Sequence, residues 1–187
     1  SRGIGEMISA GFLANGVKVY ITARKEEPLI KKAKELSNEY NGTCIPIACD
    51  LSSSLGIDYF VKMIHEKEKA IDFLINNAGA AWGQPYDEFS EAGWDKVMDL
   101  NVKSLFFLTQ KLTEMLKVRA SGDDPSRVVN IGSIDGLNVP AFETYSYSTS
   151  KAAVHHLTRV MAAKLVKENI LVNAIAPGPY PSQMLGS

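Results

Sequence analysis

Tyr147 and Lys151 are the residues of this sequence whose types and spacing most directly suggest chemistry. They lie in the stretch TYSYSTSK at 144–151, at the start of a predicted helix. Four residues make about one helical turn, so both side chains lie on the same face. A phenol beside an ammonium can donate and accept a proton near neutral pH, which predicts general acid–base chemistry.

One nearby cation can supply the free energy needed to lower the pKa of a tyrosine. Free tyrosine titrates near ~10, and lowering its pKa by roughly 2–3 units requires about 3–4 kcal/mol. One cation at about 4–5 Å, at an effective dielectric of ~20, supplies that order of energy. We therefore expect Lys151 to lower the pKa of Tyr147. Tyr145 lies on another helical face and is the weaker candidate, and most Tyr-x-x-x-Lys pairs on helices are simple surface contacts.

Two further polar residues are candidates for the same site. Ser133 follows a predicted strand, where its hydroxyl can bond a substrate carbonyl as negative charge develops, or it can simply cap a turn. Asn101 lies on an apolar stripe of a predicted helix, and a buried amide must be bonded. It either satisfies backbone groups or holds a water. No Gly-x-Ser-x-Gly elbow surrounds Ser133, which disfavours a serine hydrolase.

Composition excludes several classes of protein. The chain has 187 residues, 45% of them hydrophobic, and a net charge of −1, which suits one domain and gives no basic excess for nucleic acid or anionic membranes. No apolar run is long enough to span a membrane. Cys44 and Cys49 lie close together without a second pair, which argues against a disulfide scaffold or a zinc site. The three histidines are interpreted as ordinary helix residues.

The elements that must position these residues alternate along the chain. The strands are continuous apolar runs, which indicates burial on both faces and parallel βαβ units. The predicted fold is a single α/β domain, 1–187, with a doubly wound, Rossmann-like parallel sheet and helices on both faces. Helices are predicted at 4–16, 27–40, 56–69, 91–117 and 145–167, and strands at 17–22, 43–48, 72–75, 127–131 and 170–175.

Several candidate residues lie at the carboxyl ends of predicted strands, where ligands bind in such folds. They are Asp50, the stretch 76–79, Ser133 and the pair Pro177-Gly178. This shared position predicts one site.

A dinucleotide is the ligand that the glycines and cations favour. Gly3 and Gly5 open the first helix, where a diphosphate can approach backbone N–H groups, although this signal alone is weak. The next strand ends at Arg24 without an acidic residue. A cation there accepts the 2′-phosphate of NADP, whereas an acid would bond the ribose of NAD. Arg2 adds a second positive charge, and a solvated Arg24 is the alternative.

Seven motifs follow one another in order, and the set spans nearly the whole chain. They are SRGIG at 1–5, CDL at 49–51, NNAG at 76–79, LNV at 100–102, Ser133, Tyr147-x-x-x-Lys151 and Pro177-Gly178. This ordered set resembles the short-chain dehydrogenase/reductase superfamily. AWG at 81–83, GWDKVM at 93–98 and DDPSR at 123–127 resemble its branch of rhamnolipid-type, NADPH-dependent 3-ketoacyl (3-oxoacyl-ACP) reductases.

The resemblance implies a mechanism. Tyr147 would protonate the carbonyl oxygen, Lys151 would lower the pKa of Tyr147 and bond the nicotinamide ribose, and Ser133 would orient the carbonyl. Asn101 would hold a water in a proton relay to Lys151. The implied cofactor is NADP(H), held by Ser1, Arg2, Gly3, Ile4, Gly5, Arg24, Asp50, Leu51, Asn77, Ala78, Gly79, Tyr147, Lys151, Pro177, Gly178 and Ser182.

The resemblance also implies partners and missing parts. The substrate would be a small carbonyl compound, such as a 3-oxoacyl thioester, and helices 91–117 and 145–167 would form a homodimer or homotetramer. Neither nucleic acid nor membrane is expected as a partner, and the expected compartment is the cytoplasm. The family's central first strand and its C-terminal substrate segment are absent, so we expect residues 1–187 alone to be a poorly stable, inactive fragment. The alternatives are another carbonyl or alcohol substrate, an NAD-linked dehydrogenase, or a non-catalytic dinucleotide-binding module.

Overall fold

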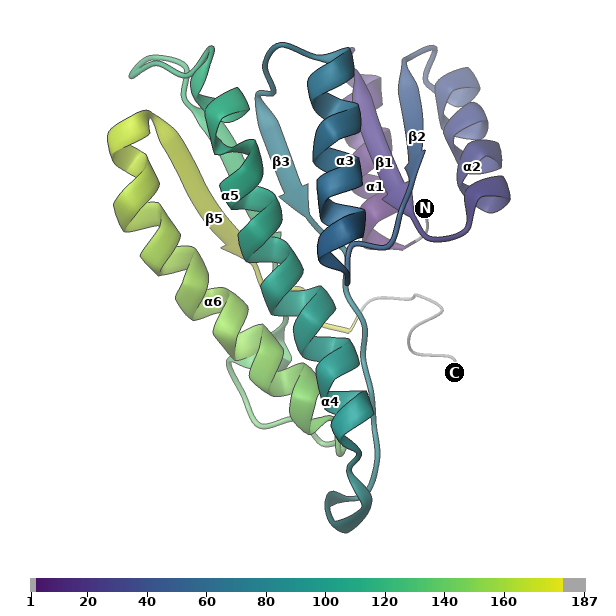
Figure 1. Ribbon diagram of the computed structural model, residues 1–187, viewed down its shortest axis with the longest axis vertical. Helices are drawn as coiled ribbons and strands as arrows, with labels where there is room; N and C mark the ends of the chain where they lie inside the picture. The colour runs from purple at the N-terminus through teal and green to yellow at the C-terminus, as the bar shows by residue number, and fades with distance from the viewer. Residues whose placement is uncertain (1–2, 180–187) are drawn as a thin grey trace.

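The computed structural model describes residues 3–179 (Figure 1). Ser1, Arg2 and Ser182, which were predicted to contact the cofactor, lie outside the described residues. Helices and strands alternate as predicted. The helices are α1 (Ile4–Ala14), α2 (Glu26–Glu39), α3 (Ser54–Lys67), α4 (Glu91–Met98), α5 (Ser104–Lys117) and α6 (Tyr145–Leu165). The strands are β1 (Val19–Ala23), β2 (Cys44–Ala48), β3 (Phe73–Asn76), β4 (Ser126–Ile131) and β5 (Ile170–Ile175).

All strand pairs are parallel, as the sequence predicted, but the strands form two sheets. One sheet has the order β1–β2, and the other has the order β3–β4–β5. In Figure 1, α3, α5 and α6 lie in front of the strands and α1 lies behind them. Helices therefore cover both faces of the molecule, and the carboxyl ends of the strands lie at one edge.

The buried apolar side chains form two cores. Leu13 of α1, Leu29 of α2 and Cys44 of β2 belong to the first core, which holds α1 and α2 on the β1–β2 sheet. The second core joins α3, α5 and α6 to β3–β5 and to Ile47 of β2, with Leu112 and Val128 fully buried. The two cores pack on opposite faces, as expected of a doubly wound α/β fold.

A cleft of about 670 Å³ lies between the two sheets. It is lined by residues of β1 and β3, with α1 on one side and α3 and α5 on the other. Within residues 3–179, no strand pairs with the edges of β1 and β3 that line this cleft. The rings of Phe12 and Phe73, whose centres are 5.1 Å apart, make a contact across it.

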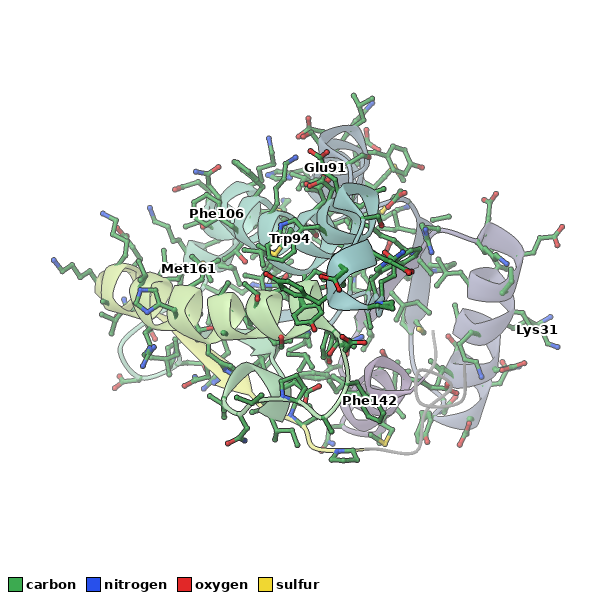
Figure 2. The ribbon with its side chains drawn as sticks, turned by 90° about the horizontal axis from the view of Figure 1, so that it is seen from below. Lys31, Glu91, Trp94, Phe106, Phe142 and Met161 are labelled. Atoms are coloured by element: carbon green, nitrogen blue, oxygen red, sulfur yellow. The ribbon has the colours of Figure 1, made fainter. Side chains whose placement is uncertain are left out.

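Two predictions about the elements need correction. The single helix expected at 91–117 contains a π-helical segment, Asp99–Lys103, between α4 and α5. Trp94 of α4, which is labelled in Figure 2 and lies before this segment, is 39% exposed. The strand β5 alternates between buried and exposed residues over most of its length, so the expectation that strands are buried on both faces is wrong for this strand.

Candidate active site

The end of β4 and the start of α6 bring the predicted catalytic residues together. Ser133 follows β4 and is 7% exposed, while Tyr147 lies in the first turn of α6. The Ser133 hydroxyl lies near enough to the Tyr147 phenol to act on its pKa, and it accepts a bond of 3.2 Å from the backbone N–H of Asp135. The Nζ of Lys151 lies 5.5 Å from the centre of the Tyr147 ring. Tyr145 instead donates to the Glu143 carboxylate, away from Lys151.

The protein's own groups do not lower the pKa of Tyr147, and this corrects the expectation from sequence. Burial raises the pKa of the phenol, and the nearby Asp135 carboxylate raises it further, while the Ser133 hydroxyl acts in the opposite direction. The spacing of Tyr147 and Lys151 predicts an attraction between them, but it does not report the cost of burying a phenolate. Tyr147 is therefore a protonated phenol at neutral pH, which is the form of a general acid.

Lys151 is itself strongly affected by burial. It is 6% exposed, and burial lowers its pKa from 10.5 to about 8. Its Nζ donates a bond of 2.7 Å to the backbone carbonyl of Ile131, at the end of β4. A Cβ on Gly79 would stand 3.7 Å from this nitrogen, so the loop after β3 passes close to the ammonium. The side chain thus joins α6, β4 and this loop.

The side chain of Asn101 forms its hydrogen bonds with other groups of the protein. It lies in the π-helical segment and is 2% exposed. Its amide accepts a bond from the Ala80 N–H at 2.8 Å and donates to the Ala80 carbonyl at 3.0 Å and to the Ser150 hydroxyl at 2.9 Å. Of the two alternatives from sequence, the structure shows bonding to the backbone. The role of Asn101 in a proton relay remains a prediction.

The glycine-rich start of α1 meets the loop after β3. Gly3 has φ = 61°, a left-handed conformation that favours glycine, and no side chain caps α1. A Cβ on Gly5 would lie 2.5 Å from the Asn77 side-chain nitrogen, so a larger residue here would displace the Asn77 amide. Ile4 begins α1, and Ala78 is exposed beside Asn77. An uncapped helix N-terminus with glycines is a suitable cradle for a phosphate.

Arg24 and Asp50 lie together at the ends of β1 and β2. Ala23 pairs with Ala48 in the sheet, and Arg24 lies close enough to lower the pKa of Asp50. Bonds from Ser52 are the larger cause of that lowered pKa. Arg24 is exposed and forms none of the ion pairs found among the described residues, so its guanidinium is available to a phosphate. Leu51 has its side chain in the apolar core, 6% exposed.

The remaining described candidates lie beside the catalytic residues. Pro177 accepts a bond of 3.1 Å from the Ile134 N–H, and a Cβ on Gly178 would lie 3.8 Å from the Ile134 side chain. The segment after β5 therefore runs next to the segment that follows Ser133. The structure thus places two groups of predicted residues along one edge: the catalytic group and residues 177–178 around α6, and Arg24 with Asp50 at β1–β2.

Sequence reasoning missed His155, which lies one helical turn after Lys151. It was interpreted as an ordinary helix residue, but its Nε2 lies 2.9 Å from the Ser133 carbonyl. The spacing of four residues from Lys151 was the available signal. Gly136 was also missed: a Cβ there would lie 2.5 Å from the backbone of Lys151, so glycine allows the segment after Ser133 to touch α6.

The structure adds two observations about classes of ligand. In the stretch from Gly3 to Pro179, no helix combines the length and the hydrophobicity needed to cross a membrane. No group of three or more His, Cys, Asp or Glu side chains in that stretch is placed to hold a metal ion. The donors at the site are instead hydroxyls, an ammonium and backbone N–H groups.

Comparison with known proteins gives a consistent result. The profile of the family described as short chain dehydrogenase matches residues 1–187. The chain is 44% identical over 184 residues to the rhamnolipids biosynthesis 3-oxoacyl-[acyl-carrier-protein] reductase of Pseudomonas aeruginosa, covering 98% of this chain and 71% of that protein. It is 32% identical over 185 residues to the 3-oxoacyl-[acyl-carrier-protein] reductase FabG of Aquifex aeolicus, covering 98% of this chain and 72% of that protein.

A solved structure is similar throughout. The Pseudomonas aeruginosa RhlG/NADP active-site complex superposes with a TM-score of 0.95 at 44% identity, covering 99% of this chain and 72% of that chain.

Proposed function

The chain belongs to the short-chain dehydrogenase family, and we propose that it reduces a ketone to a secondary alcohol with NADPH, acting on a 3-oxoacyl thioester. The observation that carries this proposal is the arrangement of three groups at one strand end. The Ser133 hydroxyl lies beside the Tyr147 phenol, and the Lys151 ammonium lies 5.5 Å from the centre of the same ring. A binding module without chemistry has no need for this arrangement.

The proposed roles follow from the chemistry of each group. Tyr147, whose pKa is raised by burial, is protonated at neutral pH and donates its proton to the carbonyl oxygen of the substrate. The Ser133 hydroxyl donates a hydrogen bond to the same oxygen as it gains negative charge. Lys151 stabilises the phenolate that remains after the proton is transferred. Asn101 holds the loop at Ala80 and the α6 residue Ser150 in place around these groups.

NADPH supplies the hydride when it is bound. The residues of this chain fit such a cofactor, because α1 has an uncapped N-terminus with Gly3 and Gly5, and Arg24 is available to a 2′-phosphate. Asp50 lies beside Arg24, on the adenosine side of the proposed site. The remaining proposed contacts are Ser1, Arg2, Ile4, Leu51, Asn77, Ala78, Gly79, Pro177, Gly178 and Ser182.

Apolar residues near Ser133 support an acyl substrate. Leu137, Val139 and Phe142 lie between Ser133 and α6 and are 63%, 96% and 76% exposed (Phe142 is labelled in Figure 2). Three exposed apolar side chains in the segment that joins Ser133 to α6 suit a substrate with an apolar chain and a carbonyl. Two similar proteins are named as 3-oxoacyl-[acyl-carrier-protein] reductases.

The proposal includes a homodimer or homotetramer, with the cytoplasm as the expected compartment. The apolar residues Trp94 of α4, Phe107 of α5 and Val160 of α6 are exposed by 39%, 39% and 53%. Exposed apolar side chains on these helices support an interface between copies. Light scattering on the purified protein measures the oligomeric state directly.

Replacing Tyr147 tests the proposed chemistry in the full-length protein. We expect Tyr147→Phe to abolish oxidation of NADPH with an acetoacetyl thioester, while NADPH binding measured by fluorescence is retained, because only the proton donor is removed. Tyr145→Phe is the matched control, since Tyr145 bonds Glu143 away from Lys151, and it should keep its activity. Wild-type protein that binds NADPH but reduces no carbonyl compound would favour the non-catalytic alternative.

Replacing Arg24 tests the choice of cofactor. In the same assay we expect Arg24→Asp to lower the preference for NADPH over NADH, because a carboxylate repels the 2′-phosphate and bonds a ribose hydroxyl. The exposed neighbour Lys25 provides the control Lys25→Asp. An unchanged ratio of NADPH to NADH turnover in Arg24→Asp would remove Arg24 from the cofactor site.

A further inference from the structure

Two main-chain carbonyls at the end of β4 are bonded by side chains of α6. The ladder between β3 and β4 ends at the pair Asn76–Asn130. Beyond it, the Ile131 carbonyl accepts a bond of 2.7 Å from Lys151, and the Ser133 carbonyl lies 2.9 Å from Nε2 of His155. A carbonyl only accepts hydrogen bonds, so the His155 ring must carry its proton on Nε2 in this contact.

The contact with His155 is closely packed. A Cβ on Gly132 would lie 2.3 Å from Cε1 of the imidazole, so the ring crosses the backbone of β4 at a position where only glycine leaves room. On the other side of the strand, the N–H groups of Gly132 and Ile134 bond carbonyls of Ile175 and Pro177. The backbone around Ser133 is thus held from β5 on one side and from α6 on the other.

Lys151 has a role in the chemistry of the proposed reaction, whereas His155 has none. The proposed reaction uses the Lys151 ammonium beside Tyr147, so this side chain has two tasks. His155 is half-buried and has no role in that chemistry, and its ring nitrogen is directed at the residue that carries the proposed hydroxyl donor. Neighbouring His156 is exposed and lies near Arg159 instead, with 3.4 Å between the two side-chain nitrogens.

We propose that His155 is a positioning residue for the proposed reduction: its Nε2–H holds the Ser133 backbone so that the Ser133 hydroxyl stays beside the Tyr147 phenol. This inference rests on the proposed function and deepens it. His155 touches neither the phenol nor the carbonyl of the substrate, so it acts only through Ser133. Small displacements of a catalytic group lower the rate of the chemical step more than they lower binding.

The kinetic test compares three variants of the purified protein in the reduction of an acetoacetyl thioester. We expect His155→Leu, which has similar bulk and no donor, to lower kcat by about 10- to 100-fold while the Kd for NADPH is unchanged. His155→Gln keeps a side-chain N–H and should recover most of kcat. His156→Leu is the matched control and should behave as wild type. Wild-type kcat in His155→Leu, or equal losses in the Leu and Gln variants, would overturn the proposal.

A spectroscopic test is independent of turnover. Nitrogen-15 NMR of the histidine rings should show that Nε2 of His155 is protonated, and His155→Leu should shift the amide signals of Ser133 and Asp135 while His156→Leu leaves them in place. An unprotonated Nε2, or unchanged amide signals, would refute the contact. If the wild type reduces no carbonyl compound, the proposed function fails, and these signals still decide whether His155 positions Ser133.

Discussion

Burial of the Lys151 ammonium destabilises the folded protein. Its side chain is 6% exposed, and burial lowers its pKa from 10.5 to about 8. At neutral pH the lysine is mostly protonated, so the folded protein holds a buried charge that the unfolded chain leaves in water. The unfolded state binds the proton more tightly, so the stability of the wild type increases as the pH rises from 8 to 10.5.

Removing this amine should therefore change how stability depends on pH. We expect the free energy of unfolding of Lys151→Met, relative to wild type, to fall by about 3 kcal/mol between pH 7 and pH 10.5, because only the wild type loses its buried charge over that range. The loss of the hydrogen bond from Lys151 to the Ile131 carbonyl lowers the free energy of unfolding by the same amount at pH 7 and at pH 10.5. Urea denaturation at several pH values measures the difference, with exposed Lys164→Met as control. A difference that stays constant with pH would contradict this explanation.

Among the elements, β3, β4, α5 and α6 are joined by a chain of buried polar side chains. The Asn76 amide donates to the Thr109 hydroxyl at 3.0 Å and to the Asn130 carbonyl oxygen at 2.9 Å. Asn130 in turn donates to the Thr158 hydroxyl at 2.9 Å, and all four side chains are buried. Asn76 precedes the proposed cofactor loop and Asn130 precedes Ser133, so this chain holds both parts of the site to the helices.

Breaking this chain at one hydroxyl tests its contribution. We expect Thr109→Val to destabilise the protein by about 1–3 kcal/mol, because it leaves a buried N–H of Asn76 without an acceptor. Thr113 provides a matched control one turn later on α5, since its hydroxyl bonds the Thr109 carbonyl of its own helix. Thr113→Val should cost less than about 0.5 kcal/mol. Equal losses in urea denaturation would show that Asn76 finds another partner.

The order of the elements could be predicted from sequence because the periodicity of apolar residues is local. The alternation of helices and strands, their approximate bounds and the placement of Ser133 and Asp50 after strands are confirmed. The π-helical segment around Asn101 was not predictable, because one added residue in a helical turn leaves no signal in composition. The partners of His155 and the raised pKa of Tyr147 depend on tertiary packing and burial, which spacing along the chain does not report.

On the scale of the whole molecule, the division into two sheets predicts how the chain unfolds. The α1–α2 core and the larger α3–α5–α6 core pack on opposite faces, only the larger core reaches both sheets, and no described strand joins β1 to β3. Backbone groups at the strand edges that line the cleft gain no ladder bonds there, which weakens the coupling between the halves. Both tryptophans of the chain, Trp82 and Trp94, follow β3 and report only on the larger half.

We therefore expect residues 1–187 alone to unfold in two steps. In urea, far-ultraviolet circular dichroism should change before tryptophan fluorescence, because the smaller half melts first and contains no tryptophan. Leu29→Ala in the α1–α2 core should lower the free energy of unfolding of the early step only, by about 2–5 kcal/mol. Leu112→Ala in the larger core should move the fluorescence transition to a lower urea concentration. Coincident transitions that both substitutions shift together would mean that the halves form one cooperative unit despite the cleft.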